Sequence, residues 1–180
     1  MNRPKQIRLG GFGGQGVVLA GHLLGLAAVA ADWWVAGANV YGARARGGIA
    51  LAEVVIAAKP IKFPRVILPD IFIAFSQQAY DRYHRELAAD GRLYYDRRLV
   101  VPAALAVDQV GIPATDLAVD ECGRQQAANL VMLGAVAAAS GLVEREYLAR
   151  AVRDHLPAPL REVNLRALEI GGRYGEQHGR

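Results

Sequence analysis

The stretch IRLGGFGGQGVVLAGHLLG at residues 7–25 decides the fold. A short apolar strand passes into a glycine cluster, and the cluster passes into an apolar helix. Five of the seven residues from Gly10 to Gly16 are glycine. Gly11, Gly13 and Gly16 match the spacing GxGxxG, which lets backbone N–H groups and the positive end of a helix approach a phosphate. The pattern predicts close approach of the backbone to a ligand; a tight turn that only packs the helix on the strand is the alternative.

The segment that follows this helix disfavours the ordinary NAD site. That site needs a carboxylate at the end of the second strand to hold the ribose hydroxyls. The sequence GANVYGARARGG at 37–48 has no carboxylate, and Asp32 precedes the strand. Arg44 and Arg46 suit an additional phosphate, either that of NADP or that of the 3′-phospho-ADP end of coenzyme A. Two arginines in one loop are also commonly solvated or salt-bridged, so both interpretations stay open.

The alternation of strands and helices in the first hundred residues, followed by helices alone, predicts the fold class. Strands are predicted at 6–9, 33–41, 49–57, 70–76 and 91–100. Helices are predicted at 15–32, at 77–89, twice within 112–141, at 142–156, and finally up to Gly171-Gly172. We expect an α/β protein with a Rossmann-like, mostly parallel sheet flanked by helices and a helical C-terminal third. Residues 1–180 are expected to form a single domain, with 172–180 as a flexible tail.

Composition narrows the class of protein. The chain has 180 residues, a net charge of +4 and 53% hydrophobic residues, which favours a subunit with a large buried face. The basic residues form no run, which disfavours nucleic-acid binding. The longest apolar stretch, residues 17–31, contains His22 and two glycines and is too short to span a bilayer. The start of the chain has no signal-peptide pattern, so we expect a cytoplasmic location without membrane insertion.

The inventory of chemically active side chains is small. Cys122 is the single cysteine, which excludes an internal disulfide and the four thiolates of an iron–sulfur cluster. No HxxxH or CxxC spacing indicates a metal site. Cys122 is expected to be a packed thiol, and Asp70 and Asp96 at strand ends are expected to cap loops. Neither a GxSxG elbow nor a P-loop Lys-Ser/Thr occurs. By itself this chain is predicted to bind a ligand and to carry no catalytic residue.

Several longer blocks of sequence occur in a particular order. They are GFGGQGVVLAGHLLGLAA (11–28), YGARARGGIALAEVVIA (41–57), PDIFIAFSQQAYDRY, GRLYYD and AANLVMLGAV. In this order they resemble the gamma subunit of the 2-oxoacid:acceptor oxidoreductases, the family of pyruvate and 2-oxoglutarate ferredoxin oxidoreductases. The second block resembles the family's YGPEARGG segment and the strand after it. Ala43 and Arg44 stand where that segment usually has proline and glutamate, which reverses a charge in the loop.

The resemblance implies a complex that oxidatively decarboxylates a 2-oxo acid to an acyl-CoA. Thiamine diphosphate attacks the keto carbon in that reaction, and iron–sulfur clusters carry the electrons away. Thiamine diphosphate, Mg²⁺ and the clusters are expected in partner subunits, because this chain has no GDG…NN pattern and one cysteine. The substrate stays open among pyruvate, 2-oxoglutarate and branched-chain, indolyl or aryl 2-oxo acids. The acceptor is ferredoxin, or NAD through a further subunit.

For this chain the resemblance implies support of the shared active site and a part in holding coenzyme A. The candidate contacts are Gly11, Gly13, Gly14, Gly16, Arg46 and Gly47. No metal ligand is expected here. Two other hypotheses stay open. One is a purely architectural subunit, whose glycines pack the helix and meet a neighbouring chain. The other is a free-standing NADP-dependent dehydrogenase.

Overall fold

The computed structural model describes residues 3–41 and 48–178 and has one six-stranded sheet in the order β2-β3-β1-β4-β5-β6. The strands are β1 (Lys5–Phe12), β2 (Trp34–Tyr41), β3 (Ile49–Ala57), β4 (Ile71–Ala74), β5 (Arg92–Asp96) and β6 (Asp108–Ile112). Strands β1, β4, β5 and β6 pair in parallel, whereas β3 pairs antiparallel with both β1 and β2. Among the described strands only β3 therefore runs against the others, and the predicted mostly parallel sheet is confirmed.

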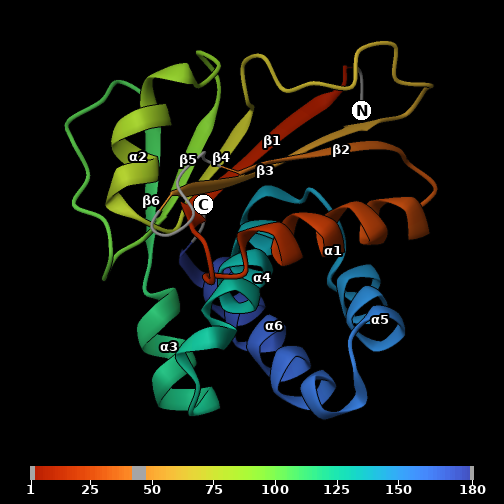
Figure 1. Cartoon of the computed structure of the whole chain (residues 1–180), viewed down its shortest axis with the longest axis vertical. Helices are drawn as coiled ribbons and strands as arrows, with labels where there is room; N and C mark the ends of the chain where they lie inside the picture. Colours follow the sequence, from red (N-terminus) through yellow and green to blue (C-terminus); the bar gives the residue numbers. More distant parts are fainter. Residues whose placement is uncertain (1–2, 42–47, 179–180) are drawn as a thin grey trace.

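Helices cover the two faces of the sheet unequally (Figure 1). They are α1 (Val17–Ala30), α2 (Gln77–Tyr83), α3 (Ala114–Cys122), α4 (Ala128–Ser140), α5 (Arg145–His155) and α6 (Ala158–His178), with 3₁₀ turns at His84–Glu86 and Gln125–Ala127. Helix α1 lies against β1, β2 and β3 and also contacts α4 and α5. Helix α2 packs against β1 and β4. The predicted helical C-terminal third is confirmed, and it lies with α1 on one face of the sheet.

The burial pattern explains why these residues form these elements. All four residues of β4 are buried, as expected for a strand that is covered on both faces. Along β1, Ile7 and Leu9 belong to the larger core, which also contains the buried residues of α1 and α4. Ten consecutive residues of α4 are buried, from Ala128 to Ala137, so this helix is the centre of the helical layer. Within the described ranges, no helix is long and apolar enough to cross a membrane.

Several element boundaries differ from those predicted. The helix predicted at 77–89 ends at Tyr83 and is followed by a 3₁₀ turn, and the strand predicted at 91–100 ends at Asp96. Strand β6 was not predicted. Helix α6 continues through Gly171-Gly172 to His178, so the prediction that it ends there was wrong. Residues 172–178 are helical, not a polar tail, because Gly171 and Gly175 let α6 pack directly on the backbone of α4.

Candidate functional site

The glycine loop (Gly10–Gly16) leaves the end of β1 and enters α1. Gln15 fixes its shape: its backbone N–H donates to Phe12 O at 3.2 Å, and its side-chain Oε1 accepts from Phe12 N at 2.6 Å. The Gln15 amide nitrogen also donates to Phe75 O at 2.7 Å, just beyond the end of β4. The Gln15 side chain therefore joins the two ends of the loop turn and connects the turn to the residue that follows β4.

Two of the four predicted loop glycines are needed for packing. A Cβ on Gly11 would lie 2.6 Å from Gln15 Oε1, 2.8 Å from Val17 Cγ2 and 2.9 Å from Phe75 Cβ. A Cβ on Gly16 would collide with the side chain of Asn129, and Gly16 has a φ of +73°. These two positions need glycine whether or not a ligand binds.

The other two loop glycines are open to solvent. A Cβ on Gly13 or on Gly14 would meet no atom within 4 Å, and both residues are exposed. Gly14 has a φ of +94°, which L side chains rarely adopt. No acidic side chain lies in the first turn of α1, and its N-cap, Gly16, offers no capping side chain. The loop and the positive end of α1 are therefore free of competing anionic groups within the helix's first turn.

A cavity of about 270 Å³ adjoins the open part of this loop. It is lined by Gly14, Gln15, Phe75, Asp96, Leu99, Thr115, Gln125, Gln126 and Ala128. Gly14 follows β1, Phe75 follows β4, and Asp96 ends β5, so the cavity lies at the carboxyl ends of three parallel strands. Ligands of open α/β sheets bind in this position. Sequence reasoning found the glycines and missed the other walls, which come from four separate segments.

Among the described residues that line this cavity, Asp96 alone has an ionisable side chain, and it is fully buried. Its Oδ2 accepts from Thr115 Oγ1 at 2.6 Å and from Thr115 N at 3.0 Å, while its Oδ1 accepts from Arg98 N at 3.0 Å. Burial raises the pKa of Asp96 above its ordinary value, and these three hydrogen bonds oppose that change. The predicted capping role of Asp96 is confirmed, because it ties the end of β5 to the start of α3.

Comparison with known proteins places this geometry in a family. The sequence profile described as pyruvate ferredoxin/flavodoxin oxidoreductase matches residues 6–174. The chain belongs to this family. The 2-oxoglutarate synthase subunit KorC of Methanocaldococcus jannaschii is 42% identical over 171 residues, which cover 93% of this chain and 91% of that protein.

Two solved structures share the fold of this chain. The gamma subunit of a keto/oxoacid ferredoxin oxidoreductase from Geobacter sulfurreducens is 31% identical, with a TM-score of 0.84 over 95% of this chain and 98% of that one. The 2-oxoglutarate:ferredoxin oxidoreductase from Magnetococcus marinus is 21% identical, with a TM-score of 0.86 over 98% of this chain and 32% of that one; coenzyme A is bound in that structure. The first confirms the predicted resemblance to gamma subunits, and the second shares the fold.

The remaining predicted contacts, Arg46 and Gly47, lie outside the described residues. The strands on either side of them end at the glycine loop. Phe12, the last residue of β1, pairs with Ile49, and Tyr41 pairs with Ala50. In this family member, β2 therefore ends and β3 begins at the same end of the sheet as the open glycines.

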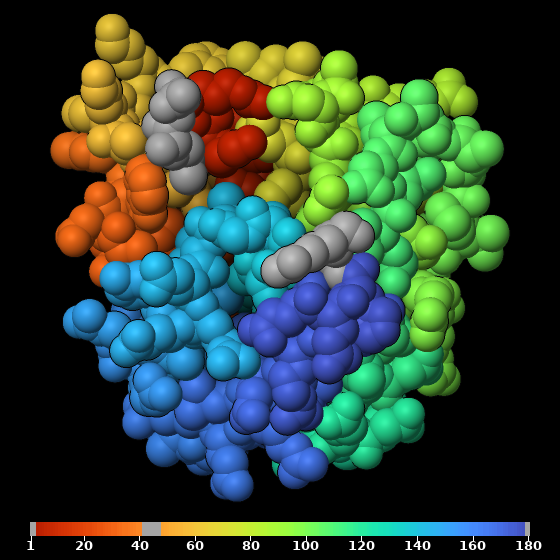
Figure 2. Space-filling model, turned by 180° about the vertical axis from the view of Figure 1, so that it is seen from behind, coloured from red at the N-terminus to blue at the C-terminus, as the bar shows by residue number. Residues whose placement is uncertain are grey.

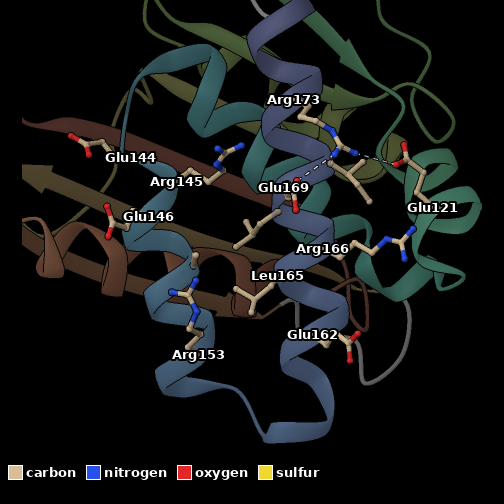
Figure 3. Close-up of a pocket in the computed structure, with 13 residues that line it drawn as sticks. Glu121, Glu144, Arg145, Glu146, Arg153, Glu162, Leu165, Arg166, Glu169 and Arg173 are labelled. Atoms are coloured by element: carbon tan, nitrogen blue, oxygen red, sulfur yellow. Dashed lines mark hydrogen bonds and ion pairs between the residues drawn. The ribbon is translucent and has the colours of Figure 1, made fainter.

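A larger hollow of about 830 Å³ lies on the helical layer, among α3, α5 and α6 (Figure 3). Its walls carry both signs of charge. Arg173 lies between Glu121 and Glu169, each 3.3 Å from its guanidinium group, and Glu144 and Glu146 point away from α6. Mixed, exposed and partly paired charges of this kind make a solvated surface. The smaller cavity at the strand ends is the better candidate for a ligand site.

Cys122 is half-buried and packs against the larger core. Burial raises the pKa of its thiol above the ordinary value, which disfavours the thiolate that a nucleophile needs. The packed thiol predicted from the sequence is what the structure contains. Asp70 is also buried; it accepts from Gln6 N at 2.7 Å and pairs with Arg3 and Lys5, so it caps the start of β1 as predicted.

Proposed function

We propose that this chain is the gamma subunit of a 2-oxoacid:ferredoxin oxidoreductase and that its open glycines hold part of coenzyme A. The observation that carries the proposal is the open pair Gly13 and Gly14, which lies beside a cavity at the carboxyl ends of β1, β4 and β5. Missing side chains there leave backbone N–H groups accessible to a phosphate. Coenzyme A supplies three phosphate groups and a nucleotide in one molecule.

The chemistry of the site fits an anionic, elongated ligand. The start of α1 has no acidic side chain to repel a phosphate. Arg46 lies in sequence between β2 and β3, whose facing ends lie beside the loop, and a guanidinium group suits a further phosphate. The described hydrogen bonds of the Asp96 carboxyl group go to Thr115 and Arg98.

The size of the cavity implies that the site is shared. Ligand pockets usually measure about 300–1,000 Å³, and this one is about 270 Å³. It therefore takes one end of coenzyme A, between the rings and alkyl groups of Phe75 and Leu99 and the amides of Gln15, Gln125 and Gln126. The rest of the molecule extends to a neighbouring subunit.

The reaction of the complex is the oxidative decarboxylation of a 2-oxo acid to an acyl-CoA. Thiamine diphosphate with Mg²⁺ and the iron–sulfur clusters belong to partner subunits, which pass the electrons to ferredoxin. This chain contributes no catalytic residue; it positions the coenzyme A that accepts the acyl group. The relative that is 42% identical over 93% of this chain acts as a 2-oxoglutarate synthase subunit by name, so 2-oxoglutarate is the first substrate to test.

The test measures the KM for coenzyme A in the assembled complex. Gly13→Ala adds a methyl group that meets no atom within 4 Å in the described part of this chain, so the chain should fold normally. If a phosphate lies against Gly13, the methyl group should raise the KM for coenzyme A about tenfold, which is about 1.4 kcal/mol of binding. Arg46→Ala should raise it by a similar factor. The KM for the 2-oxo acid should stay the same for both variants.

Gly25→Ala is the matched control. A Cβ on Gly25 would make only an ordinary contact, 3.5 Å from Val35 Cγ1, and Gly25 lies away from the loop on α1. It should leave both KM values unchanged. A Gly13→Ala complex that assembles and keeps its coenzyme A dependence refutes the ligand role.

The architectural hypothesis keeps one observation in its favour, because Gly11 and Gly16 are explained by packing alone. Under that hypothesis, Gly13→Ala and Arg46→Ala change the amount of complex recovered and leave the KM for coenzyme A of the assembled enzyme intact. Co-purification yield and KM, measured on the same preparations, separate the two functions.

A further inference from the structure

The two edges of the sheet differ in how they are protected. Edge strands expose unpaired N–H and C=O groups, and proteins usually shield them with charge, proline, bulges or short length. β6 is a short edge of five residues, and its first residue, Asp108, is ion-paired to Arg92 at 2.6 Å. β2 has eight residues, WVAGANVY, with no charge and no proline. Its pairing with β3 runs from Trp34↔Ala57 to Tyr41↔Ala50 without a bulge.

On the face away from α1 the side chains of β2 are apolar; those at the two ends of the strand are exposed and the two alanines between them are half-buried. Trp34, Ala36, Ala38 and Val40 share that face because they alternate with Val35, which lies toward Gly25 of α1. Trp34 is 54% exposed and Val40 is 41% exposed. In the described part of the chain no segment pairs with the outer edge of β2. In Figure 2 the orange segment that contains β2 lies at the rim of the molecule.

A second apolar surface lies on the opposite face of β2, toward α1. A shallow groove of about 230 Å³ between them is lined mainly by small and apolar residues: Gly21, His22, Gly25, Leu26, Val29, Val35, Gly37 and Val54. Val29, on the rim of this groove, is 56% exposed. Both faces of the edge strand are therefore lined by uncharged residues, apart from the imidazole of His22 in the groove.

We propose that the β2 edge binds the β2 edge of a second copy of this chain, in antiparallel register with Gly37 opposite Gly37. The proposal does not depend on coenzyme A binding. Antiparallel partners on one face lie directly opposite each other. In this register Trp34 lies opposite Val40 of the other copy, and Ala36 opposite Ala38. Each exposed large side chain thus meets an apolar one, and the two six-stranded sheets become continuous.

The sequence of β2 is what selects a second copy. A twofold interface places each residue against the same surface of its partner, so a charged strand would repel itself. β2 has no charge to repel. Shifting the register by two residues places Trp34 opposite residue 42 or Val40 opposite Asp32, beyond the ends of the strand. Only the register centred on Gly37 uses the whole span from Trp34 to Val40.

Disulfide trapping tests the register. In a Cys122→Ala background, Gly37→Cys places one thiol opposite its copy across the twofold axis, at a Cα separation of about 4.5–5.5 Å, which a disulfide spans. The site tolerates a side chain, because the only atom within 4 Å of a Cβ is Glu53 O at 3.8 Å. Mild oxidation should give a covalent dimer. Ala36→Cys, whose copies lie on a diagonal about 7–8 Å apart, should not.

Charge exchange tests the surface in solution. By analytical ultracentrifugation the unmodified chain should sediment at twice its mass of 19.3 kDa. Ala36→Lys alone and Ala38→Glu alone should each give monomers, because each places like charges close together across the axis. An equal mixture of the two variants should restore the dimer, since Lys at 36 then faces Glu at 38. Val101→Lys, at an 80% exposed residue far from β2 in sequence, should stay dimeric.

Three results overturn the proposal. One is an unmodified chain that sediments as a monomer. Another is a pair of charge variants that remain dimeric, which places the contact elsewhere. The third is a Gly37→Cys variant that, in the co-purified complex, crosslinks to a different subunit; that result assigns the β2 edge to a strand of that subunit instead.

Discussion

Two glycine-rich segments of this molecule look alike in sequence and differ in structure. The glycine loop (Gly10–Gly16) contains two glycines, Gly13 and Gly14, whose missing side chains leave open space, and three whose missing side chains admit neighbouring atoms. Two of the three glycines of α6 leave no such space. A Cβ on Gly171 would collide with Val131 O, and one on Gly175 with Ala135 O, both on the backbone of α4. The spacing of glycines therefore does not reveal their role; what a methyl group would touch does.

Close packing also explains why α6 does not end at Gly171-Gly172. Glycine in a helix costs about 0.5–1 kcal/mol relative to alanine, so a glycine pair normally favours a helix end. Here Gly134 of α4 faces the backbone of Leu168, and Gly171 faces that of Val131. The two helices approach at backbone contact, and the buried area gained along them outweighs the glycine cost. The comparison between loop and helix leads to four measurements, ordered by expected effect.

Gly171→Ala should cause the largest loss of stability. Its Cβ meets backbone atoms of α4, which cannot rotate away, so we expect the free energy of unfolding to fall by about 3 kcal/mol. Urea titration of the full chain measures it. Gly172→Ala is the adjacent control, because its Cβ meets only the flexible Arg145 side chain at 3.3 Å. Equal losses at the two positions would mean that backbone contact is not what requires glycine.

Gly16→Ala should cost less, about 2 kcal/mol. The residue has a φ of +73°, which strains any L side chain, and the new Cβ would also strike Asn129. The double variant Gly16→Ala/Asn129→Ala removes the collision and keeps the strain. We therefore expect the loss caused by Gly16→Ala to be smaller in an Asn129→Ala background, in the same urea assay. If the loss in the double variant equals the sum of the losses in the two single variants, the collision with Asn129 contributes nothing to the cost of Gly16→Ala.

Gly25→Ala should stabilise the chain by about 0.5–1 kcal/mol. It is an interior position of α1 where a Cβ makes only an ordinary contact with Val35, so the gain comes from the helix preference of alanine. The measurement is the shift of the thermal unfolding midpoint. A decrease would indicate that α1 and β2 are packed more tightly than the 3.5 Å contact implies.

Gly13→Ala should change stability least, by less than about 0.5 kcal/mol. Its φ is not in the positive range and no atom lies within 4 Å of the added Cβ. Gly14→Ala, one residue along, should lose about 1–2 kcal/mol from its φ of +94° alone. A large loss at Gly13 would place it with the packing glycines and remove the basis for a ligand role.

The sequence predicted most of the fold because its strong signals are local. The runs in β3 and β4 are apolar and β-branched, and α5 carries buried Leu148, Ala151 and Val152 at helical spacing. β6, with the sequence DQVGI, has no such signal; it forms because β5 offers it a parallel edge to pair with. A strand of that kind is specified by its neighbour rather than by its own residues.

Half of the candidate site was predictable for the same reason. The glycine loop is contiguous in sequence, so its spacing was visible. Asp96 and Thr115, which face each other across 19 residues, and Gln15, which reaches Phe75 across 60, are brought together only by strand order. No local pattern marks such pairs. The position of Asp96 at a predicted strand boundary was the one available hint, and it pointed to capping rather than to a cavity.

Asn129 connects the N-terminus of α1 to the buried helix α4. The Asn129 Nδ2 donates to Gly16 O at 3.2 Å. Asn129 belongs to α4, and the backbone of α4 is in direct contact with the glycines of α6. A displacement of α4 would therefore move a side chain that is hydrogen-bonded to Gly16, the N-cap of α1. Because α6 packs on the backbone of α4, a partner chain that binds the outer surface of α6 would contact the same helix pair that carries Asn129.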